Sequence, residues 1–249
     1  MISALFHDYL YVPIYNLLIF LTGAIPGADI GVAVILVTIF IKVITLPLSI
    51  SAVKTSRHMK LIEPQIKKIK EKYKDNKEKL AKETFALYKN NGIKPFSSIL
   101  GTLIQLPVLI ALYFVFSREE LLHVNLDLIY SFVAIPANIS PLFLDYFSIT
   151  GHSVILAVVA GVVQYFLALV SIAIPEKSVD GKGSIGEDFG RSMAIQARFI
   201  LPLLIMVFAY TSGAIALYFI TASIVGLFQE LLVRRMKQPE IKEHIFGIT

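Results

Sequence analysis

The chain contains no cysteine, which excludes disulfides, thiolate metal sites and a lipoprotein signal. Its first residues, MISALFHDYLYV, lack both the basic start of a signal peptide and the arginine-rich character of a transit peptide. The five histidines are scattered, without the spacing of a metal site or a nucleophile–base pair: His7, His58, His123, His152 and His244. We therefore expect neither an enzyme nor a bound cofactor.

The sequence also lacks an internal repeat of 20–50 residues, which weakens the case for an inverted-repeat transporter. What it has in abundance is apolar sequence. With 249 residues, 56% of them hydrophobic, and a mean hydropathy of +0.72, it is typical of a polytopic membrane protein. The predicted fold class is all-α, with several helices crossing the bilayer.

Residues 30–53 form an apolar stretch, IGVAVILVTIFIKVITLPLSISAV, with Lys42 at its centre. About 20 apolar residues suffice to cross a bilayer, and Lys42 lies roughly 18 Å from either end of the stretch at about 1.5 Å per residue. A buried charge at that depth costs about 2.5–3.5 kcal/mol on insertion scales. No carboxylate lies in the middle of any other apolar segment, and the nearest is Glu230. The lysine is therefore a candidate functional residue, the alternative being a structural charge paired with a buried carboxylate.

Polar residues follow one face of several predicted spans. Thr38, Lys42, Thr45 and Ser49 recur at helical spacing in the first span. Ser98, Thr102 and Gln105 do the same in a later span, and Gln164 lies in the middle of another. These eight side chains predict a hydrophilic groove inside a helix bundle, although glutamines in spans also serve as plain interhelical hydrogen bonds.

Ten segments are predicted along the chain. They are an extracytoplasmic N-terminus with an interfacial amphipathic helix (1–29), a first span (30–53), a basic cytoplasmic helical hairpin (54–94), a second span (95–116), an extracytoplasmic loop with interfacial helical pieces (117–151), a third span (152–174), a cytoplasmic loop (175–198), a fourth span (199–211), a fifth span (214–233) and a cytoplasmic tail (234–249). A sixth span near residues 11–25 is the alternative to the interfacial helix.

The hairpin holds most of the positive charge. Residues 54–94 contain thirteen Lys or Arg against five Asp or Glu, so this segment is +8 and the rest of the chain sums to −3, given the total of +5. Two apolar seams follow its arms, one through Ile62, Ile66 and Ile69 and one through Leu80 and Leu87. Because basic segments stay in the cytoplasm, we expect the N-terminus outside and the C-terminus inside.

Four motifs resemble the YidC family of membrane protein insertases: FIKVITLPLS, the basic hairpin from MKLIEPQIKK to KNNGIKP, LIQLPVLIALYFVF and TSGAIALYFITASIVGLFQ. They occur in order between Ile14 and Arg235. The resemblance implies a bacterial inner-membrane protein of a minimal type, with five spans around a groove that opens to the cytoplasm and the lipid. Lys42 stands where the family commonly has arginine. Newly made membrane proteins would be the substrates, inserted alone or beside the Sec translocon, with the hairpin as a ribosome-docking element.

The residues suggest a mechanism in which Lys42 attracts acidic residues in the substrate's outgoing tail, while apolar faces of the third and fifth spans guide its hydrophobic segment. A channel or ion-coupled transporter that uses Lys42 as an intramembrane charge is the alternative. The basic hairpin could also rest on anionic lipid headgroups. Sequence-specific nucleic-acid recognition is not expected, since no known module is visible.

Overall fold

The computed structural model describes residues 2–74, 76–93, 96–117, 124–172, 174 and 185–236, with side chains left out at 2, 3, 96–105, 117 and 185–190. Two compact units divide the chain. The first comprises Met1–Ile44 and Leu106–Glu230, and the second comprises Thr45–Gln105 and the residues from Leu231 onward. Each is described by itself below.

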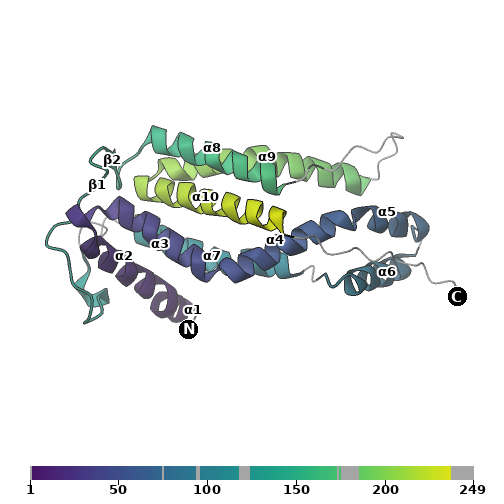
Figure 1. The fold of residues 1–249 in the computed structure, drawn as a ribbon, viewed down its shortest axis with the longest axis horizontal. Coiled ribbons are helices and arrows are strands. Elements are labelled where there is room, and N and C mark those ends of the chain that lie inside the picture. The colour runs from purple at the N-terminus through teal and green to yellow at the C-terminus, as the bar shows by residue number, and fades with distance from the viewer. Residues whose placement is uncertain are drawn as a thin grey trace. The chain divides into compact units, whose positions relative to one another are not determined.

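Helices account for most of both units (Figure 1). Their bounds are α1 Ile2–Phe6, α2 Val12–Ala24, α3 Ile30–Ile44, α4 Leu46–Leu61, α5 Glu63–Lys72, α6 Lys77–Asn90, α7 Phe96–Ser117, α8 Val154–Ser171, α9 Ile185–Tyr210 and α10 Gly213–Arg235. Shorter elements are a π-helical turn His7–Tyr11, two 3₁₀ turns Pro26–Ala28 and Leu126–Leu128, and the strands β1 Leu142–Phe143 and β2 Phe147–Ser148.

Within the described residues, four helical stretches are long and apolar enough to cross a membrane: Ala4–Ala24, Val154–Ser171, Arg191–Tyr210 and Gly213–Arg235. A fifth is obtained if α3 and α4, separated by Thr45 alone, form one broken span. Pro47 lies at the start of α4, where a missing backbone N–H is tolerated. The all-α membrane architecture is confirmed.

Two helices differ in extent from the sequence prediction. The N-terminal helix satisfies the criteria for a span by length and composition, which was the alternative to an interfacial helix. Helix α9 begins at Ile185, fourteen residues before the predicted start at residue 199. The polar residues of this segment suggested a loop, but helix propensity is a weak signal that packing can override, and α9 packs along α8.

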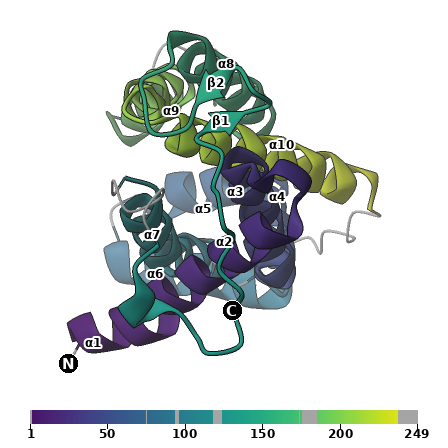
Figure 2. The same ribbon diagram turned by 90° about the vertical axis from the view of Figure 1, so that its left-hand side faces the viewer.

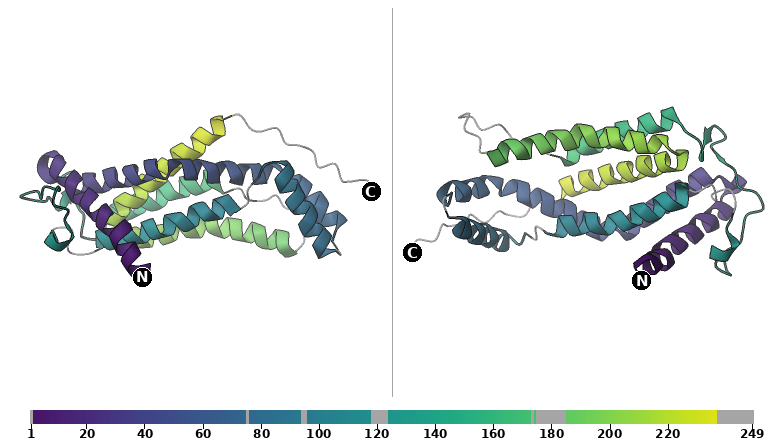
Figure 3. Two further views of the ribbon diagram at one scale, coloured as in Figure 1. Left: turned by 90° about the horizontal axis from the view of Figure 1, so that it is seen from below. Right: turned by 180° about the vertical axis from the view of Figure 1, so that it is seen from behind.

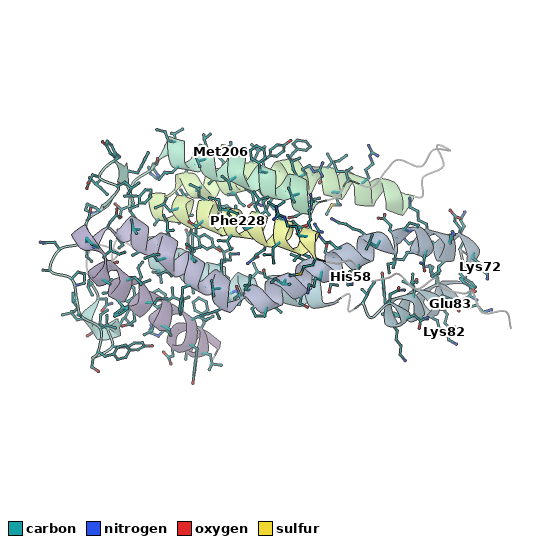
Figure 4. All side chains as sticks on the ribbon, in the orientation of Figure 1. His58, Lys72, Lys82, Glu83, Met206 and Phe228 are labelled. Atoms are coloured by element: carbon teal, nitrogen blue, oxygen red, sulfur yellow. The ribbon has the colours of Figure 1, made fainter. Side chains whose placement is uncertain are left out.

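The core of the first unit is a contiguous apolar cluster from α2, α3, α7, α8, α9 and α10. Tyr15, Leu18 and Ile19 of α2 are almost fully buried against α3, which contributes Ile30, Val34 and Val37. Helices α8 and α9 run side by side, as Figures 1 and 3 both show. Gly161 of α8 permits that approach, because a Cβ there would stand 2.7 Å from Cε of Met206 on α9 (Figure 4).

Residues 124–152, the cap segment, close one end of the first unit (Figure 2). Within it, β1 and β2 pair antiparallel, with Leu142 opposite Ser148. The segment is bonded to the starts of two helices: Leu144 N donates to Asp29 Oδ2 at 2.9 Å, and Ser212 Oγ donates to the Ile149 carbonyl at 2.9 Å. The sequence predicted interfacial helical pieces here, whereas the described part contains one 3₁₀ turn and this hairpin, because Pro136 and Pro141 interrupt any longer helix.

In the second unit, α5 and α6 form a two-helix hairpin (Figure 3). Ile62, Ile69, Leu87 and Ile93 are buried between its arms, with Met59, Ile66, Tyr73, Leu80 and Tyr88 packed around them. Asn76 begins α6 by accepting a hydrogen bond from Lys79 N at 3.0 Å. Burial raises the pKa of the Tyr88 hydroxyl. The apolar seams of the two arms therefore meet, while the lysines lie outside them.

Candidate functional site

The start of α3 is fixed by Asp29. Its Oδ1 accepts hydrogen bonds from Gly31 N at 2.8 Å and Val32 N at 3.1 Å, as a helix N-cap does. Gly31 is required by close packing, since a Cβ there would lie 2.7 Å from Cβ of Phe143. This end of α3 is therefore anchored to the cap segment, which sets the rotation of the helix about its axis.

That rotation places the two faces of α3 in different surroundings. Val34, Val37 and Thr38 are fully buried, whereas Phe40 and Val43 are 50% and 59% exposed. Thr38 satisfies its own hydroxyl by donating to the Val34 carbonyl at 2.7 Å. The buried face is the one that packs in the unit, and the exposed face is the one available to lipid.

Lys42 belongs to the inward face. It follows Thr38 by one helical turn, so the two side chains project in nearly the same direction. It is half-buried, in contrast to Val43 and Ile44 beside it, which are exposed. The only charged residue of α3 is thus directed away from the face that Phe40 and Val43 present.

Five other members of the predicted groove belong to the second unit. Thr45 and Ser49 are half-buried residues of the second unit, at the start of α4. Ser98, Thr102 and Gln105 lie on α7, in the part whose side chains are outside the described residues. Among the groove residues whose side chains the structure describes, Thr38 and Lys42 share one face of α3, and the wider groove stays a prediction.

Gln164 makes an interhelical hydrogen bond. Ser223 Oγ of α10 donates to Gln164 Oε1 of α8 at 2.7 Å. Ser223 is 2% exposed, so the bond is shielded from solvent on the α10 side. This contact is the structural role that the sequence offered as the alternative for this residue.

A double-mutant cycle tests what Gln164 does. We expect Gln164→Leu and Ser223→Ala to show a coupling of about 0.6 kcal/mol in the free energy of unfolding, the average for such bonds in membranes. Unfolding would be followed in mixed detergent micelles, alongside an insertion assay. Additive effects on stability together with lost insertion in Gln164→Leu alone would instead assign Gln164 to substrate contact.

A second feature of the first unit is an apolar cavity of about 460 Å³. It is lined mainly by Ile110, Tyr113 and Phe114 of α7, Leu201, Leu204 and Phe208 of α9, and Ile215, Tyr218 and Phe219 of α10. These helices are the second, fourth and fifth predicted spans, whereas the sequence pointed to the third and fifth as the apolar guide. Helix α8 does not line this cavity, but its side chains Val158, Val162 and Phe166 are exposed, so the guiding role of the third span stays a prediction.

Sequence reasoning missed the polar side chains that hold the first unit together. Asn16 is buried and donates to the Leu128 carbonyl, which lies 112 positions later in the sequence. Ser223 is buried and donates to Gln164, which lies 59 positions earlier. Neither has a local motif, so only the fold reveals its partner. Among the residues that the structure describes, no group of three or more His, Asp or Glu side chains could hold a metal ion.

Comparison with known proteins places these features in a family. A family model described as "60Kd inner membrane protein" matches residues 20–240. The chain is 30% identical over 213 residues to a protein of Clostridium tetani named "Membrane protein insertase YidC", covering 86% of this chain and 85% of that one. It is 28% identical over 241 residues to "Membrane protein insertase MisCA" of Bacillus subtilis, covering 95% and 80%. A "Membrane protein insertase YidC 2" of Bacillus anthracis is 26% identical over 245 residues, covering 96% and 84%.

Proposed function

Since the chain belongs to the YidC family of membrane protein insertases, we propose that Lys42 attracts acidic residues in the outgoing tail of a substrate while the substrate's apolar segment enters the bilayer. As a multi-pass protein of the bacterial membrane it meets such substrates at the lipid boundary. The observation on which the proposal rests is the inward projection of Lys42 from a helix that has no other charged residue.

The polar surface would extend from Thr38 and Lys42 to the other residues of the predicted stripes. Thr45, Ser49, Ser98, Thr102, Gln105 and Gln164 are assigned to it from the sequence pattern. Hydroxyl and amide groups lower the cost of moving a charged tail from water, because they replace part of its hydration. The groove is proposed to open to the cytoplasm, with the C-terminus inside as the basic hairpin requires. The N-terminus is outside when the N-terminal helix lies in the interface, as the sequence predicts, and inside when that helix spans the membrane.

The cap segment supports a closed outer side. It is bonded to the starts of α3 and α10 through Asp29, Ile149 and Ser212, so these helix ends are held by hydrogen bonds between side chains and backbone groups. A substrate tail would therefore leave through the lipid-facing side rather than through an aqueous pore. Substrate proteins and the lipid bilayer are the partners this requires, and the Sec translocon and ribosome are proposed as further ones.

Reconstitution tests the proposal. The purified protein is placed in liposomes, a small membrane protein with an acidic tail is added, and protease protection of the tail is measured. We expect protection that depends on the protein and does not need an ion gradient. Ion flux through the same liposomes, or insertion only with a gradient, would support the channel or transporter instead.

The apolar cavity is proposed to receive the substrate's hydrophobic segment. Leu204→Trp would fill part of it, and we expect insertion to fall about fivefold, equal to ~1 kcal/mol. Val207→Trp is the matched control, because Val207 lies on the same helix, is 67% exposed and does not line the cavity. Equal insertion by both variants would remove the cavity from the mechanism.

A further inference from the structure

The second unit contains a polar pocket that no part of the proposed mechanism uses. It has a volume of about 360 Å³, and α4 lines it with Pro47, Ile50, Ser51, Lys54, Thr55 and His58. Gly92, in the link after α6, completes the lining. Gly92 has a φ of +63°, and nothing lies within 4 Å of where a Cβ would stand, so the pocket is open beside it.

The lining is suited to an anion. Lys54 provides an ammonium group, His58 an imidazole, and Ser51 and Thr55 provide hydroxyls, all at helical spacing on α4. None of the seven lining residues, all within the described part of the chain, is acidic. Lys54 and Ser51 are exposed and Thr55 is 8% exposed, so the polar side chains of α4 extend from the mouth of the pocket to its floor.

The polarity of the pocket changes along the helix. Pro47 and Ile50 come first, next to the end of the apolar stretch, and Lys54 and His58 come last. From Pro47 to His58 is about 16 Å along the axis at ~1.5 Å per residue. An apolar end followed by an end with the Lys54 ammonium and the His58 imidazole matches an amphiphile with an anionic head better than a free phosphate or a nucleic-acid backbone.

We propose that this pocket binds an anionic phospholipid, with the headgroup phosphate at Lys54 and His58 and the start of an acyl chain at Pro47 and Ile50. The pocket lies where the first predicted span gives way to the basic hairpin, the level at which a lipid phosphate is found. Basic pockets on the cytoplasmic side of membrane proteins recognise anionic headgroups in this way. The bound lipid would fix the depth of α4 in the bilayer, independently of how Lys42 acts.

Native mass spectrometry of the full-length protein tests the proposal. The protein in detergent is titrated with phosphatidylglycerol and phosphatidylcholine, and the occupancy of retained lipid is measured. We expect phosphatidylglycerol to be retained in preference. Lys54→Gln and His58→Gln should each lower its apparent affinity about fivefold.

Lys82→Gln is the matched control, because Lys82 is an exposed lysine of α6 in the same unit, away from the pocket (Figure 4). It should leave the affinity unchanged, and all variants should elute as the unaltered protein does on gel filtration. A loss as large as that in Lys54→Gln would mean diffuse attraction to the basic hairpin and would overturn the proposal, as would equal retention of the two lipids.

Chain length separates a lipid from a free anion. Ile50→Asn should weaken binding of phosphatidylglycerol and leave binding of glycerophosphoglycerol, which has the same headgroup without acyl chains, unchanged. Displacement of the long-chain lipid by an equal concentration of inorganic phosphate would make the pocket a free-anion site. Preferential capture of a short RNA over lipid would assign it to nucleic acid, and either result rejects a lipid site.

Discussion

Replacing Lys42 with Ala is expected to reduce insertion of acidic-tailed substrates by about tenfold or more, while Lys42→Arg retains most of the activity. Two unit charges about 6 Å apart attract by ~3 kcal/mol at an effective dielectric constant of about 20. That energy corresponds to roughly a hundredfold in a binding equilibrium, and partial hydration of the groove lowers it. Protease protection of the substrate tail in liposomes provides the measurement.

Stability separates this loss from a folding defect. A lysine at the centre of a span costs about 2.5–3.5 kcal/mol on insertion scales, so Lys42→Ala should unfold no more easily than the unaltered protein. Lys42→Met keeps the length of the side chain without its charge and should behave like Lys42→Ala. A substrate whose tail is neutral serves as the control and should be inserted equally by all four proteins. If the acidic tail is also inserted equally, Lys42 has no part in the mechanism.

Much of this arrangement could be predicted from the sequence because its signals are local. Hydrophobic runs locate the helices. The spacing of Ile62, Ile66 and Ile69 by three and four residues indicates one buried helix face, and the hairpin core lies on that face. The helical offset of Thr38 and Lys42 gives their common direction without knowledge of the fold. These inferences depend on geometry that a single helix already has.

Other features depend on contacts between distant segments, and the sequence could not supply them. The apolar cavity needs α7, α9 and α10 at once, so no single apolar run identifies it. The β1–β2 hairpin places Leu144 and Asp145 at φ values of +51° and +63°, although neither is the glycine or asparagine that usually signals such a turn. Its stability comes from Asp29, 115 residues away, which accepts from the Leu144 N–H.

Replacing Asn16 with leucine is expected to have the second large effect, a loss of stability. Its Nδ2 donates to the Leu128 carbonyl at 2.7 Å, and its Oδ1 accepts from Tyr130 N at 2.7 Å, with the residue 3% exposed. Asn16→Leu would leave both backbone groups of the cap segment unpaired, at about 1–3 kcal/mol each. We expect the free energy of unfolding to fall by about 2–4 kcal/mol, measured by denaturant titration in mixed micelles.

Tyr15→Phe provides a comparison in which a smaller loss of stability is expected. Its hydroxyl accepts a hydrogen bond from Asn125 N at 2.9 Å, and loss of that bond should cost about 1 kcal/mol. The sign of the Asn16→Leu effect also distinguishes two positions for the N-terminal helix. If the helix packs against the cap segment through Asn16, leucine destabilises the protein; if this face meets lipid instead, removing an amide from hydrocarbon stabilises it. An increase in stability would therefore contradict the bridging role of Asn16 and separate the helix from the core of the first unit.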